Sequence, residues 1–248
     1  MRVGLNTAKI NTVAYLIAMG SFIFSLFYVS TRAILDQAYR INTEYKIILF
    51  QTAFGILTVN LPTILTRRLR FRIPNVFAAL YTVFLWCSIF LGEVMLFYYR
   101  LPHFDAFLHL ISSMMLGLLG FSLIDVLNND RRHLLLKLSP AYEAFFSVCF
   151  AVFVGVLWEI YEFTFDGILG LNMQKFLSPT DRGTEPLIGR AALVDTMTDL
   201  IIDCIGSLLG AVFGYISLKR KRGWLELFRI SVDSPPQGDH GRKPPSPK

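Results

Sequence analysis

Charged residues are scarce in this chain of 248 residues: Asp, Glu, Lys and Arg together make up 17% of it, while 54% is hydrophobic. A soluble domain carries about 25% charged residues and needs polar surface to face water. The apolar residues are gathered into long runs, so lipid must be the solvent for most of the surface. Cysteine is rare as well. The three cysteines lie inside apolar segments without CxxC spacing, which argues against a disulfide framework or a thiolate zinc site.

Several catalytic signatures are absent from the sequence. It has no Gly-rich phosphate loop, no G-x-S-x-G elbow and no HExxH helix. Its net charge of +6 comes from Lys and Arg clustered at the ends of apolar runs. That distribution is typical of a membrane protein and not of a basic nucleic-acid-binding face. We therefore expect membrane lipids as partners and no nucleic acid.

Six apolar stretches are long enough to cross a bilayer, which takes about 20 helical residues. They predict an all-α, polytopic membrane helix bundle with spans at approximately 10–29, 45–66, 74–98, 105–126, 141–165 and 192–217. The transmembrane domain is expected at 1–222. Residues 223–248 are expected to form a cytoplasmic juxtamembrane segment and a disordered, Pro-rich tail. Within the long fifth connection, an interfacial or re-entrant stretch is expected around 168–177.

The distribution of positive charge predicts the orientation of these spans, because cytoplasmic loops carry an excess of Lys and Arg. Thirteen of these residues fall on one side of the predicted bundle and seven on the other. We therefore expect both termini to be cytoplasmic and the protein to lie in the cell membrane. The even number of spans is consistent with this orientation.

Ionisable residues recur inside the last three spans, where each costs about 2.5–3.5 kcal/mol at the bilayer centre and so marks function or helix contact. Helical spacing puts them on one face of each span, and the predicted topology puts these faces in the outer half of the bilayer. The six candidate site residues are Asp105, His109, Glu159, Glu162, Asp195 and Asp199. Asp203 continues the stripe of Asp195 and Asp199, and Glu93 on the third span lies at a similar height.

Glycines lie on the same helix faces as these ionisable residues. Gly155 shares the face of Glu159, and the stripe of Asp195 and Asp199 continues into three glycines four residues apart, Gly206, Gly210 and Gly214. Small residues at this spacing let helices approach closely. The last three spans are therefore expected to form a shared pocket.

One imidazole among several carboxylates suits a divalent metal ion. In this interpretation the metal ligands are Asp105, His109, Glu162 and Asp195. The catalytic residues are Glu159, as general base, and Asp199, which supports the ligand shell. The enzyme would act on a lipid or polyprenyl-linked headgroup. Two alternatives stay open: a proton- or cation-coupled transporter that loads its ion on these carboxylates, and a structural or partner-binding protein in which they tie the helices together.

Four segments of these spans carry a family resemblance: Phe104-Asp-Ala-Phe-Leu-His109, Trp158-Glu-Ile-Tyr-Glu162, Asp195-Thr-Met-Thr-Asp199 and Asp203-Cys-Ile-Gly206. They resemble the YjdF-like family of small bacterial integral membrane proteins. They are also distantly similar to VanZ-like proteins, which have an Asp-x-x-x-His helix, a Glu-bearing helix and a final helix with Asp and glycine. The resemblance covers about 105–214. It implies membrane residence and the positions of the site residues. It implies no reaction, because the YjdF-like family has no established biochemical activity.

Overall fold

The computed structural model describes residues 2–35, 43–69, 71–129, 138–177 and 185–232. In these ranges six helices are long and apolar enough to cross a membrane. They are Thr7–Leu35, Ile48–Arg68, Asn75–Val94, Phe104–Ile124, Pro140–Leu169 and Gly189–Lys219. The predicted all-α, polytopic helix bundle is therefore confirmed, and the orientation of its termini stays a prediction. The expected Pro-rich tail at 233–248 lies outside the described residues.

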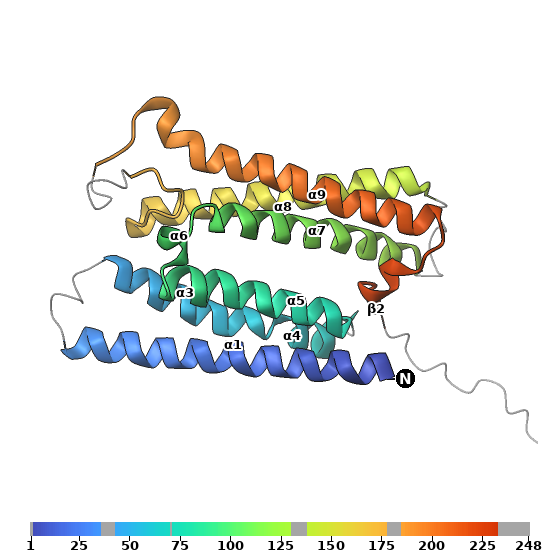
Figure 1. Ribbon diagram of the computed structural model, residues 1–248, viewed down its shortest axis with the longest axis horizontal. Coiled ribbons are helices and arrows are strands. Elements are labelled where there is room, and N and C mark those ends of the chain that lie inside the picture. The colour runs from blue at the N-terminus through green and yellow to red at the C-terminus, as the bar shows by residue number, and fades with distance from the viewer. Residues whose placement is uncertain (1, 36–42, 70, 130–137, 178–184, 233–248) are drawn as a thin grey trace, which may run out of the picture.

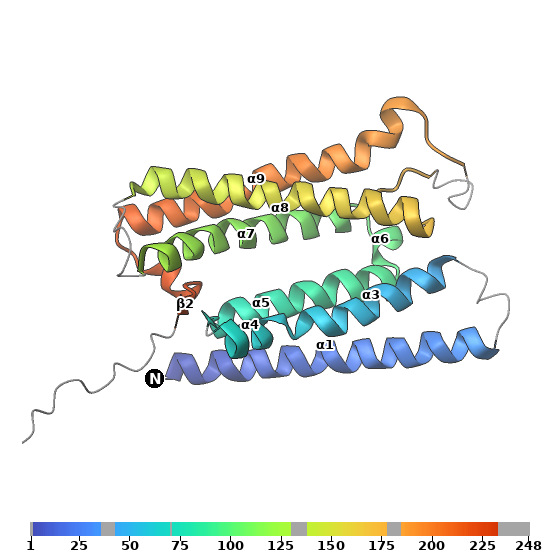
Figure 2. The same cartoon turned by 180° about the vertical axis from the view of Figure 1, so that it is seen from behind.

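The helices form two layers (Figure 1). The first layer contains α1 (Arg2–Leu35), α3 (Thr43–Val59), α4 (Leu61–Leu69), α5 (Asn75–Leu85) and the π-helix η1 (Trp86–Val94). The second layer contains α7 (Phe104–Asn129), α8 (Pro140–Leu169), the 3-10 helix η2 (Gly189–Leu193) and α9 (Val194–Lys219). The view from behind shows the same division (Figure 2). Each layer therefore contributes three spans in chain order.

The first layer is held by a small apolar core and by polar bonds between its helices. The core consists of Ala18, Phe22, Val59 and Ile89. At the junction of α3 and α4, Pro62 lacks the N–H that would bond to the carbonyl oxygen of Thr58. The hydroxyl of Tyr81, on α5, donates to that oxygen at 2.8 Å. Pro62 therefore does not leave this carbonyl unpaired, and the bond ties α5 to the junction.

The third span ends at Val94 and not near residue 98 as predicted, because the chain turns back on itself there. Leu96 has a left-handed backbone with φ of 60°. This turn folds the ring of Tyr98 over Gly92, where a Cβ atom would overlap the ring. The π-helical turns of η1 thus lead into a backbone reversal beside the candidate site. Single π-helical turns are frequent at functional sites.

Two connections join the layers at opposite ends of the bundle (Figure 1). They are made by α6 (Phe97–Arg100) at one end and by β1 (Phe71–Arg72), η3 (Trp224–Leu227) and β2 (Ser231–Val232) at the other. On the α6 side, the rings of Phe97 and Tyr98 both contact Phe104, the first residue of α7. On the other side, β1 and β2 pair antiparallel. There the hydroxyl of Ser122 also donates to the carbonyl oxygen of Phe228 at 2.6 Å.

Glycines let the three helices of the second layer pack closely. A Cβ atom at Gly210 on α9 would lie 2.6 Å from the carbonyl oxygen of Met114 on α7. A Cβ atom at Gly120 would lie 2.7 Å from the Cα atom of Ser147 on α8. Both distances are too short for any larger residue, so the predicted use of small residues for close helix contact is confirmed.

Candidate functional site

His109 lies at the centre of a buried cluster of carboxylates in the second layer. Its Nδ1 atom is 3.3 Å from an oxygen of Asp203 on α9. Its Nε2 atom is 3.9 Å from an oxygen of Asp199 and 4.0 Å from an oxygen of Asp105. A carboxylate beside Nδ1 accepts the proton of that nitrogen, which assigns the lone pair of the neutral ring to Nε2. The lone pair therefore faces the two other carboxylates.

Local sequence fixes this arrangement on both helices. Asp105 and His109 are four residues apart on α7, and so are Asp199 and Asp203 on α9, so each pair lies on one helix face. The hydroxyl of Ser113 donates to the carbonyl oxygen of His109 at 2.7 Å. On α9, Asp199 and Asp203 are 3% and 2% exposed, so their positions are set by packing and not by solvent.

Gly155 on α8 makes room for the carboxylate that orients His109. A Cβ atom at Gly155 would overlap the side chain of Asp203. The backbone of α8 therefore packs against Oδ2 of Asp203, while Oδ1 of the same carboxylate faces His109. This glycine was predicted to share the site face of α8, and the structure gives the reason: it holds Asp203 against the imidazole.

A loop after α8 covers the cluster. Gly170 ends the helix with φ of 66°, and the carboxylate of Asp166 accepts the backbone N–H groups of Met173 and Gln174 at 2.8 and 3.0 Å. These bonds hold residues 171–174 of the loop against the end of α8. The stretch expected around 168–177 therefore comprises the last residues of α8 and this loop, which packs on the candidate site.

Lys175 projects from this loop onto two carboxylates of the site. Its Nζ atom lies 3.1 Å from an oxygen of Asp195 and also bonds to Asp105. Burial alone would lower the pKa of Lys175, but the carboxylates of Asp105 and Asp195 outweigh it and hold that pKa above its ordinary value. Lys175 is therefore a fixed positive charge beside the cluster.

The two glutamates of α8 differ in their surroundings. An oxygen of Glu162 accepts the indole N–H of Trp158 at 2.9 Å. Glu159 is 5% exposed, with Thr196 and Gln174 beside it. Within the described part of the chain neither of its carboxylate oxygens has a hydrogen-bond partner in good geometry. A buried carboxylate without a partner is costly, so Glu159 is the residue least explained by a structural role.

The structure brings all six predicted site residues into one neighbourhood, where their charges interact. Among the described residues, the group whose ligand atoms all lie within 4.8 Å of one another is Asp105, His109 and Asp199. Glu162 and Asp195, two of the predicted metal ligands, stand outside this group. Asp203, which the sequence placed on the stripe of Asp195 and Asp199 but not among the six site residues, contacts His109 directly. Lys175 was missed, and the sequence holds no signal for it.

The donor set fits a divalent ion. Protein sites for first-row divalent metals combine imidazole nitrogens with carboxylates. At such sites the second nitrogen of the imidazole is usually held by another carboxylate, as Asp203 holds that of His109. A site of three protein ligands leaves positions for water or substrate. The present spacing of about 4 Å between Nε2 and each carboxylate oxygen leaves space for an ion between them.

The fold and this cluster define a multi-pass membrane protein with a buried carboxylate–histidine cluster among its last three spans. Residues 14–220 match the family described as "Predicted membrane protein (DUF2238)". The chain therefore belongs to this family, and the predicted resemblance to YjdF-like membrane proteins is confirmed. Neither a curated protein nor a solved structure matches the chain. The likeness to VanZ-like proteins stays a prediction.

Proposed function

We propose that this protein is a membrane-embedded enzyme that binds a divalent metal ion and acts on the headgroup of a lipid or polyprenyl-linked molecule. The observation that carries the proposal is the placement of His109 Nε2 between the carboxylates of Asp105 and Asp199, while Nδ1 faces Asp203. The proposed ligand set is therefore Asp105, His109 and Asp199. Compared with the set expected from sequence, Asp199 becomes a ligand, and Asp203 takes the supporting role.

The residues around this set have separate roles in the proposal. A bound divalent ion supplies a Lewis acid that polarises a phosphoryl or carbonyl oxygen and activates water. Asp203 keeps the imidazole in the tautomer that presents Nε2. Glu159, which is buried and has no hydrogen-bond partner in good geometry among the described residues, accepts the proton of the attacking water as general base. Lys175 offsets part of the negative charge of Asp105 and Asp195.

The two other classes of function have less support. A structural network would have its carboxylates hydrogen-bonded in good geometry. Among the described residues Thr196 and Gln174 lie beside Glu159, but neither meets its carboxylate in that geometry. An ion-coupled transporter needs polar groups along a path across the membrane. The cavity next to the cluster is lined mainly by apolar residues, such as Leu116 and Leu119 of α7 and Phe77 of α5, and its polar lining outside the cluster consists of uncharged side chains such as Thr58 and Ser88. These residues favour an apolar ligand over a hydrated ion.

The test is metal analysis of the protein purified from cells without added metal, by inductively coupled plasma mass spectrometry. We expect close to one divalent ion per chain in the wild type and almost none in His109→Ala. His103→Ala is the matched control, because His103 is exposed in the loop before α7 and should leave the metal content unchanged. Absence of metal from the wild type, or equal loss in both variants, overturns the proposal.

We further propose that the protein lies in the cell membrane with both termini in the cytoplasm, which puts the cluster in the outer half of the bilayer. The excess of Lys and Arg on the side of the termini supports this orientation. Cysteine labelling tests it. A cysteine placed at exposed Glu185, in the loop between α8 and α9, should react with a membrane-impermeant maleimide in intact cells. A cysteine at Glu226 should react only after lysis; the reverse pattern contradicts the orientation.

A further inference from the structure

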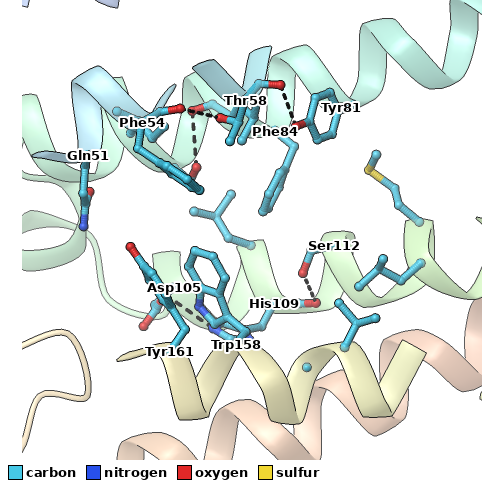
Figure 3. Close-up of a pocket in the computed structure, with 18 of the residues that line it drawn as sticks. Gln51, Phe54, Thr58, Tyr81, Phe84, Asp105, His109, Ser112, Trp158 and Tyr161 are labelled. Carbon is cyan, nitrogen blue, oxygen red and sulfur yellow. Dashed lines mark hydrogen bonds and ion pairs between the residues drawn. The ribbon is translucent and has the colours of Figure 1, made fainter. Parts of the chain in front are cut away.

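A cavity of ≈ 420 Å³ lies between the two layers and has the carboxylate–histidine cluster at one end (Figure 3). Its walls come from α3, α4, α5 and η1 of the first layer and from α7, α8 and the loop after α8 of the second. Protein sites for one small ligand have volumes of about 300–1,000 Å³. The cavity is therefore large enough for a ligand that contacts both layers.

The cavity extends from the cluster to the opposite end of the bundle. His109 lines it at the cluster, and so does Leu119, ten residues further along α7. At 1.5 Å per helical residue these two positions are about 15 Å apart along the helix axis. Ile73, which follows β1, and Ile230, which precedes β2, also line the cavity. Since the paired strands lie at the end of the bundle away from α6 (Figure 1), the cavity has His109 at one end and two isoleucines at the other.

The hydroxyl groups in the wall of the cavity already have partners. Those of Thr58, Tyr81, Ser88 and Ser112 donate to backbone carbonyl oxygens at 2.8–3.2 Å. Figure 3 shows these bonds for Thr58, Tyr81 and Ser112. Buried water needs free polar partners, whereas apolar cavities stay dry and take up apolar molecules. The space between the two ends therefore favours a hydrocarbon over water.

An acyl chain of a membrane lipid matches the cavity in polarity and in length. Among the described residues, the charged side chains of the wall lie at the end next to the cluster, and the opposite end is apolar. The hydrocarbon core of a bilayer is about 30 Å thick, so one acyl chain spans about 15 Å of it. The wall from His109 to Leu119 has about this length. A polyprenyl chain of a lipid carrier is much longer and would leave most of its length outside.

We infer that the cavity binds one acyl chain of a membrane lipid and that Ile73 and Ile230, at the methyl end of the chain, limit its length. The inference names the substrate class of the proposed enzyme, an acyl lipid. It rests on the proposed function in one respect, since the group linked to the chain would lie at the metal ligands. The binding of the chain depends only on the cavity.

The test is native mass spectrometry of the full-length protein in detergent with single-chain probes, an equal mixture of lauroyl and palmitoyl lysophosphatidylcholine. The wild type should retain the palmitoyl probe several-fold more than the lauroyl probe, because the shorter chain leaves the end at Ile73 and Ile230 unfilled and loses its contacts there. Ile230→Trp fills this end and should bring the ratio to one or below. A wild type without a preference between the probes overturns the inference.

Matched tryptophan variants outside the cavity are the controls. Leu227, three residues before Ile230, is 50% exposed and absent from the cavity lining, so Leu227→Trp should keep the wild-type ratio. If Ile230→Trp fails to fold, Leu65→Trp fills the same end from α4. Its control is Ile64→Trp, at a position that is 42% exposed and outside the lining. A folded cavity variant with the wild-type ratio, or an equal shift in its control, overturns the inference.

Metal content measured on the same samples separates this inference from the proposed function. Ile230→Trp and Leu65→Trp should keep their metal, because neither residue belongs to the ligand set. A protein that holds no metal and still shows the shift in chain length would refute the proposed enzyme and leave the acyl-chain site standing. A protein that holds metal and shows no shift would refute the acyl-chain site alone.

Discussion

Asp203→Asn is the substitution that most directly tests how the cluster is organised. Asp203 does not belong to the proposed ligand set, and it contacts His109 through Nδ1 at 3.3 Å. If its carboxylate sets the tautomer and the basicity of His109, loss of the charge should weaken metal binding without removing a ligand. Loss of such an outer partner typically costs 10–100-fold in metal affinity, and 3.3 Å is long for a hydrogen bond. We therefore expect about tenfold, or ~1.4 kcal/mol.

The assay is isothermal titration of the purified, metal-stripped protein with Mn²⁺ in detergent. Asp195→Asn is the matched control on the same helix, because Asp195 bonds to Lys175 and lies outside the cluster of ligand atoms. It should change the affinity much less. If Asp203→Asn binds Mn²⁺ as tightly as the wild type while His109→Ala does not bind it, Asp203 does not orient the imidazole and the proposed division of roles is wrong.

Three further changes test the packing around the cluster. Gly155→Ala should lower the thermal midpoint by an amount equivalent to about 1–3 kcal/mol, since its Cβ would overlap Asp203; Gly167→Ala on the same helix, where a Cβ meets open space, should leave stability unchanged or raise it. Lys175→Met should lower the thermal midpoint of the metal-free protein but enlarge the rise on adding Mn²⁺, because it removes a positive charge bound to Asp105. Because the pKa of Lys175 is raised, its contribution to stability should be constant below the ordinary lysine pKa of about 10.4 and fall only above it; a difference from the wild type that changes between pH 6 and 9 contradicts this. Tyr81→Phe should cost about 1–3 kcal/mol by leaving the carbonyl oxygen of Thr58 unpaired, whereas Tyr142→Phe on the exposed surface should have no effect.

The helical spans could be predicted from sequence because each depends on one local property, about 20 apolar residues in a row. The same holds for the stripes on α7 and α9, since a four-residue spacing puts two side chains on one helix face whatever the rest of the chain does. Asp105 and His109, or Asp199 and Asp203, are therefore found together in both the sequence and the structure. Which carboxylate lies beside which imidazole nitrogen was not predictable, because it depends on how α7 and α9 are rotated and shifted against each other.

The contacts of the loop after α8 could not be predicted from the sequence. Lys175 was counted only as a positive charge in an outer connection, yet it bonds to Asp105 and Asp195. Its position depends on the two backbone N–H bonds to Asp166 and on the reversal at Gly170. Such turns are specified by contacts between a helix end and a loop, which no periodic pattern encodes. The early end of the third span at Val94 has the same origin, since it depends on the ring of Tyr98 packing over Gly92.

The two layers have different roles in the proposed function. The three helices of the second layer pack closely through glycines and hold His109, Asp199 and Asp203 in fixed positions, as a metal site requires. The first layer contributes none of the proposed ligands and is tied to the second at the two ends of the bundle, with the cavity between them. A cavity bounded by separate layers can differ in shape between relatives without disturbing the cluster. Substrate choice should therefore depend on the first-layer residues that line the cavity, and the chemistry on α7, α8 and α9. Exchanging cavity residues of α3 and α5 should change lipid preference and leave metal binding intact.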